Sequence, residues 1–221
     1  MSLSKLDKLK KAESYALRLF DEITRQNIIR AGRMESEINR DILELASTQF
    51  GIEKYWHKRI VRAGENTLYP YDENPSDLMT QDDDILFLDF GPIFESYEAD
   101  IGRTYVLGNN ELKLRLKNDV EDAWFAARDY LFAHRELTSS DFYKYVVSLA
   151  KQYGWDYGGE IAGHIIGQFP HENIGPSKYH NYLHPDNHAR IVTPKTQHWI
   201  IEIHFVDKKN KIGGFFEQLA I

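Results

Sequence analysis

The chain has 221 residues, of which 42% are hydrophobic, so it is long enough to bury one sizeable core. Its net charge of −7 argues against the broad basic surface that nucleic acids require, so we expect no nucleic-acid partner. It contains no cysteine, which excludes disulfides, thiolate metal sites and cysteine nucleophiles. No stretch has the character of a signal peptide or a membrane span, so we expect a cytoplasmic protein with no membrane partner.

The first fifty residues predict two amphipathic helices. Apolar residues recur at helical spacing over residues 5–31, and Gly32 provides a stop. The same spacing returns over residues 35–49, before Gly51. Residues 53–80 are irregular and rich in turn-forming residues, so we expect no regular element there.

The rest of the chain predicts strands, then helices, then strands again. ILFLDFG and YEADIGRTYVLG are β-branched and aromatic, which is typical of two strands joined in a hairpin. Helices are expected over residues 111–135 and from the Thr138 cap region to Gly154, and strands over 198–207 and 213–221. With no long linker and no repeat, the pattern favours a single α+β domain over residues 1–221, with a helical start at about 5–50 and a core at about 55–221.

Four acidic residues lie where buried strands are expected. Asp89 follows Ile85–Leu88 directly, and Asp100 precedes Ile101 at the start of the next strand. Glu202 and Glu217 interrupt two further apolar runs, WIIEI and GFFEQL. Burying one charge costs several kcal/mol unless a partner or a metal compensates it.

A single acid of this kind more often faces solvent or pairs with an arginine, but four in four apolar strands favour a shared site. If the four carboxylates converge, two divalent cations would balance their charge. His164, between glycines in an apolar run, is the candidate imidazole ligand, although a lone buried histidine is usually a hydrogen-bonded core residue. Carboxylates with one imidazole suit Mn²⁺, Co²⁺, Fe²⁺ or Zn²⁺.

These residues resemble the creatinase/methionine aminopeptidase family, which includes the prolidases and aminopeptidase P and whose catalytic domain has the pita-bread fold. LDFGPIFESYEADIGRT carries two acids eleven residues apart, GHIIGQFPHE carries two histidines, and WIIEIH and FFEQLAI each carry one glutamate. The resemblance spans roughly residues 55–221. It implies a dinuclear site whose metal ligands are Asp89, Asp100, His164, Glu202 and Glu217. It also implies that Glu202 shuttles protons and that His171 contacts the substrate and the transition state.

The sequence departs from the family in one respect that bears on activity. The family usually has a further substrate-side histidine 17 to 19 residues before the first aspartate. Here Tyr71 occupies that window, and His57, in YWHKRIV, is too far upstream to align without a shift. We expect Tyr71, or Tyr69 beside it, to take over part of the substrate positioning.

Other polar residues carry weaker signals. His180, His184 and His188 are spaced by four, but Pro185 among Asn and Asp favours a loop with solvated histidines over a metal-binding helix. His204 shares a strand face with Glu202, so it either supports the site or packs in the core. Residues 82–84 are all Asp and predict a solvated turn before the strand.

The resemblance implies hydrolysis of the N-terminal bond of a short peptide, with Xaa-Pro substrates favoured because VRAGENTLYPYDEN resembles the prolidase side of the family. Two divalent ions, Mn, Co, Zn or Fe, are the expected cofactors. The alternatives are a methionine aminopeptidase, a family member that has lost catalysis and binds peptides or proteins, and C–N hydrolysis of the creatinase type. The sequence leaves the oligomeric state open, with a homodimer as one option.

Overall fold

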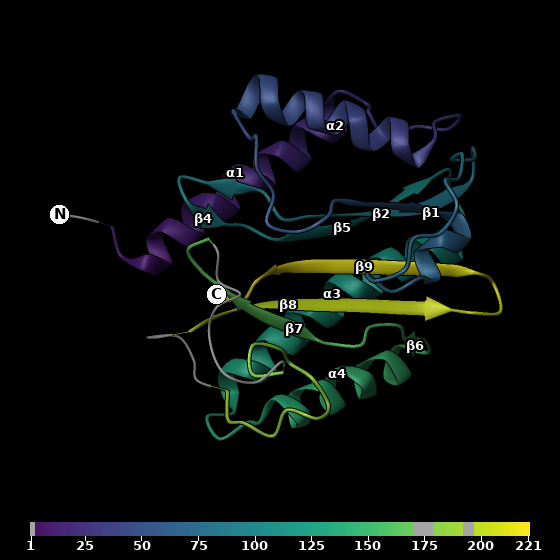
Figure 1. Cartoon of the computed structure of the whole chain (residues 1–221). Coiled ribbons are helices and arrows are strands. Elements are labelled where there is room, and N and C mark those ends of the chain that lie inside the picture. Colours follow the sequence, from purple (N-terminus) through teal and green to yellow (C-terminus); the bar gives the residue numbers. More distant parts are fainter. Residues whose placement is uncertain (1–2, 170–178, 192–196) are drawn as a thin grey trace.

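A computed structural model describes residues 3–169, 179–191 and 197–221 of the chain (Figure 1). Two helices, α1 (Lys5–Arg25) and α2 (Glu35–Phe50), come first. Ser4 begins α1 by accepting a hydrogen bond from the Asp7 backbone N–H. Within the described ranges, no helix is long and apolar enough to cross a membrane.

Helix α1 ends six residues earlier than its periodicity predicts. Asn27 has a φ of 51°, and the Ile28 backbone N–H bonds back to the Ile23 carbonyl at 3.2 Å. This left-handed residue closes the helix in the manner of a C-terminal cap. Ile28 and Ile29 stay buried even so, because the turn folds them into the same core that the helix covers.

A short strand, β1 (Ile60–Ala63), and a 3-10 helix, η1 (Gly64–Leu68), lie in the region where no regular element was expected. β1 pairs antiparallel with β2 (Asp84–Phe90), which pairs with β5 (Ile101–Leu107) as the expected hairpin partner. A small two-stranded sheet, β3 (Ile93–Phe94) with β4 (Tyr97–Glu98), forms the connection between β2 and β5. The missed strand has only four residues, of which one is charged, and this is too short to give a periodic signal.

The second half repeats the pattern of helices followed by strands. α3 (Glu111–Ala133) and α4 (Ser139–Tyr153) are capped by Asn110 and Thr138, and α4 ends at a left-handed Gly154, close to the predicted bounds. The remaining strands are β6 (Asp156–Tyr157), β7 (Gly163–Ile166), β8 (His198–Asp207) and β9 (Ile212–Leu219). Among the described residues, seven strands form one sheet in the order β1-β2-β5-β9-β8-β6, with β7 also paired to β8.

Each half of the sheet has its own helix pair and its own core (Figure 1). In the α1/α2 half, Leu86, Leu88 and Phe90 of β2 pack in the cluster that these helices cover. In the α3/α4 half, Ile201 and Ile203 of β8 lie in the other cluster, together with Phe216 of β9. Because side chains alternate along a strand, the residues between these apolar ones point away from the helices.

Candidate metal centre

Three of the predicted acids form one row across the sheet. Asp89 of β2 pairs in register with Gly102 of β5, Gly102 pairs with Glu217 of β9, and Glu217 pairs with Glu202 of β8. Residues in register on neighbouring strands point to the same face, so the three carboxylates share the face opposite the helices. Like charges placed side by side in this way are destabilising unless something neutralises them.

Gly102 allows the strands that carry these acids to approach closely. A Cβ atom at this position would lie 2.4 Å from the Phe215 ring and 2.9 Å from the Glu217 Cβ. Both contacts are shorter than van der Waals packing permits. The row of acids therefore depends on a residue without a side chain between Asp89 and Glu217.

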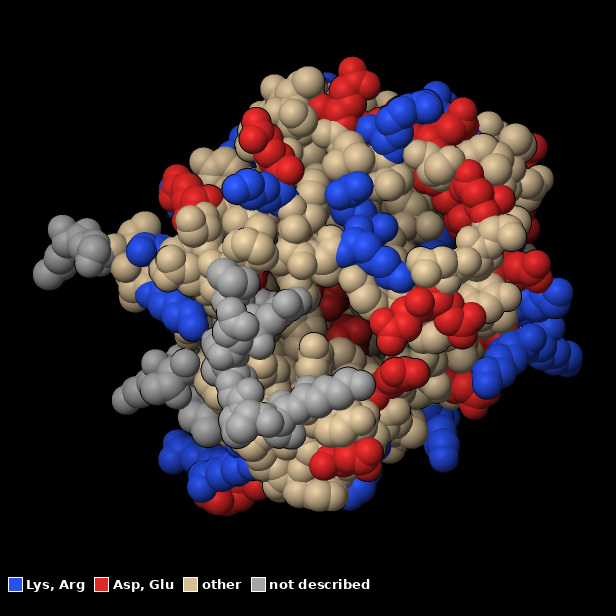
Figure 2. Space-filling view, in the orientation of Figure 1, with Lys and Arg blue, Asp and Glu red and all other residues tan. Residues whose placement is uncertain are grey.

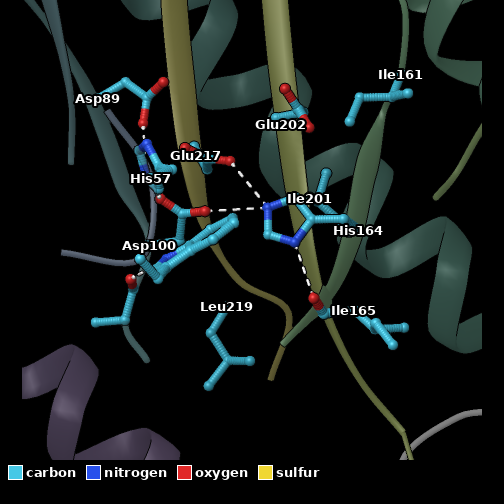
Figure 3. Close-up of polar contacts among 12 residues, drawn as sticks. His57, Asp89, Asp100, Ile161, His164, Ile165, Ile201, Glu202, Glu217 and Leu219 are labelled. Carbon is cyan, nitrogen blue, oxygen red and sulfur yellow. Dashed lines mark hydrogen bonds and ion pairs between the residues drawn. The ribbon is translucent and has the colours of Figure 1, made fainter. Parts of the chain in front are cut away.

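Asp100, one residue before β5, lies between two imidazoles (Figure 3). His57 Nε2 is 3.1 Å from Asp100 Oδ1, and His164 Nε2 is 3.0 Å from Asp100 Oδ2. Each ring also faces a second acid: His57 Nε2 is 3.6 Å from Asp89 Oδ1, and His164 Nε2 is 3.7 Å from Glu217 Oε1. His164 reaches the site from β7, whose residues pair with the end of β8 that leads to Glu202.

The carboxylates of the row hold protons more tightly than usual. Burial raises the pKa of Asp89 to about 6 and that of Glu202 to about 8. Burial, reinforced by Asp100 and Asp89, raises the pKa of Glu217 well above its ordinary value. Without cations, the site therefore keeps part of its acids neutral.

Asp100 and the two histidines shift in the opposite sense. Burial alone would raise the pKa of Asp100, but His57 and His164 outweigh it and lower that pKa. Burial alone would lower the pKa of His57, but Asp100 and Asp89 raise it to about 9. The pKa of His164 likewise lies well above its ordinary value, against the effect of burial, because of Asp100 and Glu217. Positive charge is thus favoured on both sides of Asp100.

The donor set fits divalent cations. Ligand atoms of His57, Asp89 and Asp100 lie within 4.8 Å of one another, and so do those of Asp100, His164 and Glu217. Asp89 Oδ1 and Glu217 Oε2 are buried and have no hydrogen-bond partner among the described residues. A buried carboxylate oxygen without a donor is costly, and one cation in each cluster would compensate it. Asp100 belongs to both clusters.

The predicted site residues do not all stand in the same relation to the centre. Glu202 belongs to neither compact cluster, but it faces Glu217 in register. Its side chain is partly exposed, whereas the other acids of the row, Asp89 and Glu217, are buried. Tyr71 is 43% exposed, and its hydroxyl accepts a hydrogen bond from the Lys58 backbone N–H at 3.2 Å. His171 lies outside the described residues.

His57 is the site residue that the spacing argument missed. β1 pairs with β2, with Ile60 opposite Asp89, and the Trp56 backbone N–H bonds to the Gly91 carbonyl at 2.9 Å. This pairing carries His57 to Asp89 and Asp100 through space, although it precedes them by about thirty and forty residues in the chain. The signal in the sequence was a histidine next to a tryptophan, two charged residues ahead of a short apolar segment.

Four further histidines in the described part of the chain belong to neither cluster. His180, His184 and His188 lie in turns and loop, as predicted. His204 Nε2 is 2.8 Å from the Thr67 carbonyl, and burial lowers its pKa to about 4, so it is a neutral residue that holds η1 against the sheet. Asp84 also differs from the expected solvated turn, because its buried carboxylate accepts from the Gln81 and Ile85 N–H groups and begins β2.

One face of the molecule is hollowed (Figure 2). Figure 2 shows a recess near the middle of the viewed face with acidic atoms at its floor and basic side chains near its upper edge. A recess of this kind, with carboxylates at the bottom, is typical of a site that takes up cations and a small substrate.

Solved structures with a closely similar fold include a prolidase from Thermococcus sibiricus (TM-score 0.78, 20% identity, 97% of this chain, 55% of that chain). An X-Pro aminopeptidase from Thermotoga maritima gives a TM-score of 0.74 at 23% identity over 97% of this chain and 57% of its own. A methionine aminopeptidase from the same organism gives 0.73 at 16% identity over 99% and 93%. These similarities define the class: the chain has the pita-bread fold.

Residues 7–219 match Metallopeptidase family M24, so the chain belongs to this family, whose members use divalent metal ions. A protein of Mycoplasma pneumoniae that is provisionally named an Xaa-Pro aminopeptidase is 30% identical over 139 residues. That similarity covers 61% of this chain and 38% of the relative. The chain thus spans well under two thirds of this relative, and little more than half of the prolidase and X-Pro aminopeptidase structures.

Proposed function

We propose that the chain is a dinuclear metal-dependent peptidase that hydrolyses the N-terminal bond of short peptides, with Xaa-Pro substrates favoured. One observation carries the proposal: two clusters of carboxylates and imidazoles share Asp100, and each leaves a buried oxygen without a hydrogen-bond donor. The clusters belong to a chain of family M24. The Mycoplasma pneumoniae relative supports the Xaa-Pro preference.

In this proposal the metal ligands are Asp89, Asp100, His164, Glu202 and Glu217. Four carboxylates match the charge of two divalent ions, which removes the repulsion within the row. The donor set of oxygens with imidazole suits Mn²⁺, Co²⁺, Zn²⁺ or Fe²⁺. When bound, such ions supply the positive charge that polarises a scissile carbonyl and lowers the pKa of a water molecule.

The protein's own groups would move the proton and hold the substrate. Glu202 is the partly exposed acid of the row, so it is best placed to take a proton from water and deliver it to the leaving amine. We assign to His171 a hydrogen bond to the developing oxyanion. Tyr71, whose side chain is partly exposed beside His57, would contact the peptide near the leaving nitrogen.

The experiment is a substrate panel with the protein loaded with Mn²⁺ or Co²⁺. The proposal predicts turnover of Ala-Pro peptides, and turnover of Met-Ala-Ser in preference would make the chain a methionine aminopeptidase instead. If no short peptide is cleaved with both metals bound, the chain is a binding member of the family and the proposed activity is wrong.

A pair of variants tests Tyr71 within the same panel. Removal of one positioning hydrogen bond typically costs on the order of 10²-fold in rate, so Tyr71→Phe should lower kcat/KM toward that extent, and Tyr71→His should retain or raise it. A silent Tyr71→Phe, together with inactive His171→Ala, would remove Tyr71 from the mechanism. Elemental analysis of each variant separates this effect from loss of metal.

A further inference from the structure

His57 and His164 occupy equivalent positions on the two sides of Asp100. Their Nε2 atoms lie 3.1 and 3.0 Å from Asp100 Oδ1 and Oδ2 respectively. Each Nε2 also lies 3.6–3.7 Å from one further carboxylate, Asp89 on one side and Glu217 on the other. Of these two histidines, the family resemblance assigns a metal-binding role to His164 alone.

The two rings are fixed by the same local contact. His57 Nδ1 donates to the carbonyl of the next residue, Lys58, at 2.7 Å, and His164 Nδ1 donates to the carbonyl of Ile165 at 2.8 Å. A backbone carbonyl at Nδ1 selects the tautomer whose Nε2 carries the free lone pair, which is the arrangement that metal-binding histidines generally show. In both residues Nε2 points at the carboxylates, where a cation would take the place of its proton.

His57 is held in place as firmly as a ligand requires. Its side chain is 8% exposed, and the Trp56 ring lies against it, with centroids 4.4 Å apart, and also against His164, at 5.1 Å. The indole N–H of Trp56 donates to the Ala99 carbonyl at 3.1 Å. Gly91 makes room for both rings, because a Cβ there would lie 2.2 Å from the imidazole and 2.3 Å from the indole.

We propose that His57 is a further ligand of the metal centre, on the Asp89 side of Asp100, where it mirrors His164 on the Glu217 side. The inference rests on the proposed dinuclear centre and adds a residue to it. Ligand atoms about 2.0–2.2 Å from an ion can lie up to about 4.4 Å apart, so a cluster within 4.8 Å needs only a small contraction to bind one.

This ligand changes the chemistry of the site. Each ion would then have one imidazole nitrogen, where the family's pattern gives an imidazole to one ion alone. Nitrogen donors shift selectivity away from Mg²⁺ and Mn²⁺ and toward Co²⁺, Zn²⁺ and Fe²⁺. Tyr71 lies beside this ligand, since its hydroxyl accepts from Lys58 N–H, one residue from His57, and its ring centroid is 5.9 Å from that of His57.

The direct test is proton NMR of the full-length protein loaded with Co²⁺. A histidine bound to Co²⁺ through Nε2 gives a strongly shifted, solvent-exchangeable resonance from its Nδ1–H, so the number of such resonances counts imidazole ligands. We expect two in the wild type. His57→Ala should remove one, His164→Ala should remove the other, and the exposed control His188→Ala should remove neither.

A Co²⁺ titration tests the role of His57 through the affinity of the two metal sites. Loss of an outer-shell partner typically lowers metal affinity by about 10–100-fold, so His57→Ala, which removes a direct ligand, should weaken one of two Co²⁺ sites by at least about 100-fold. Added imidazole, which fits the space that the deleted ring leaves, should restore part of that affinity in His57→Ala and not in the wild type. A retained melting temperature in the presence of chelator shows that the variant is folded.

The outcomes separate this inference from the proposed function. One shifted resonance, removed by His164→Ala and unchanged by His57→Ala, would overturn the role of His57 and leave a metal centre of the family type. Failure of the wild type to bind Co²⁺ at all would overturn the proposed function itself. Unchanged metal affinity in His57→Ala with altered KM would make His57 a substrate contact instead.

Discussion

The register of Glu202 and Glu217 predicts that the acids of the site destabilise the protein until metal binds. Glu202→Gln keeps the shape of the side chain and removes its charge. Burial raises the pKa of Glu202 to about 8 from an ordinary value of 4.5. The stabilising contribution of the protonated acid is therefore fully present below pH 4.5 and is lost as the pH rises through 8.

The magnitude follows from these two pKa values. At pH 7 the free energy of unfolding of the metal-free wild type is lower by as much as about 3 kcal/mol, since each pH unit between 4.5 and 7 costs about 1.36 kcal/mol. Glu202→Gln avoids this cost, so the metal-free variant should melt higher than the wild type by as much as about 6–12 °C, at 2–4 °C per kcal/mol for a chain of this size. The difference should shrink toward pH 5.

The difference should shrink when metal is added. One ion at a hundred times its Kd stabilises the wild type by about 2.7 kcal/mol, or about 5–10 °C, whereas the variant lacks one carboxylate and should gain less. The assay is calorimetry at pH 5, 7 and 8, with chelator and then with Mn²⁺ or Co²⁺. Glu160→Gln, an exposed control shortly before β7, should change neither melting temperature. Equal behaviour of Glu202→Gln and Glu160→Gln would refute the electrostatic account of the row.

Three further perturbations address separate parts of the account. Asp100→Asn should lower the bound metal from two ions toward none in elemental analysis, because Asp100 faces both clusters; a variant that retains two ions would contradict this. Gly102→Ala should destabilise the fold by about 1–3 kcal/mol in denaturant titration, since its Cβ would lie 2.4 Å from the Phe215 ring; an unchanged midpoint would show that the strands can separate at no cost. Burial raises the pKa of Glu13 to about 7, so its stabilising contribution is lost as the pH rises from 4.5 through 7. Glu13→Gln keeps an acceptor for the Leu219 N–H and should reduce the stability difference between pH 5 and pH 8 by as much as about 3 kcal/mol. An undiminished difference would assign the pH dependence to other groups.

Much of the fold follows from local patterns in the sequence. Helices α3 and α4 begin after Asn110 and Thr138, whose side chains accept backbone hydrogen bonds, and α4 ends at Gly154, which adopts the left-handed conformation. The strand around Asp89 was recognisable from its apolar residues, and Asp89 itself stood out because a charge in such a run is costly unless the fold compensates it. These signals are short in range and are read within a few residues.

The parts that were missed depend on contacts between distant segments. Helix α1 ends at Arg25 because Asn27 turns the chain, and apolar residues beyond the turn continued the helical pattern that predicted a longer helix. His57 reaches the centre only because β1 pairs with β2, a register that spacing along the chain does not reveal. Counting back from Asp89 led instead to Tyr71, which lies against His57 with ring centroids 5.9 Å apart.

The central claim is that two metal ions flank Asp100, and anomalous diffraction tests it most directly. A crystal of the full chain grown with Co²⁺ would be measured on both sides of the cobalt absorption edge. The account predicts two anomalous peaks, one between Asp100 and the pair His57 and Asp89, the other between Asp100 and the pair His164 and Glu217. A single peak, or peaks that do not touch Asp100, would contradict it.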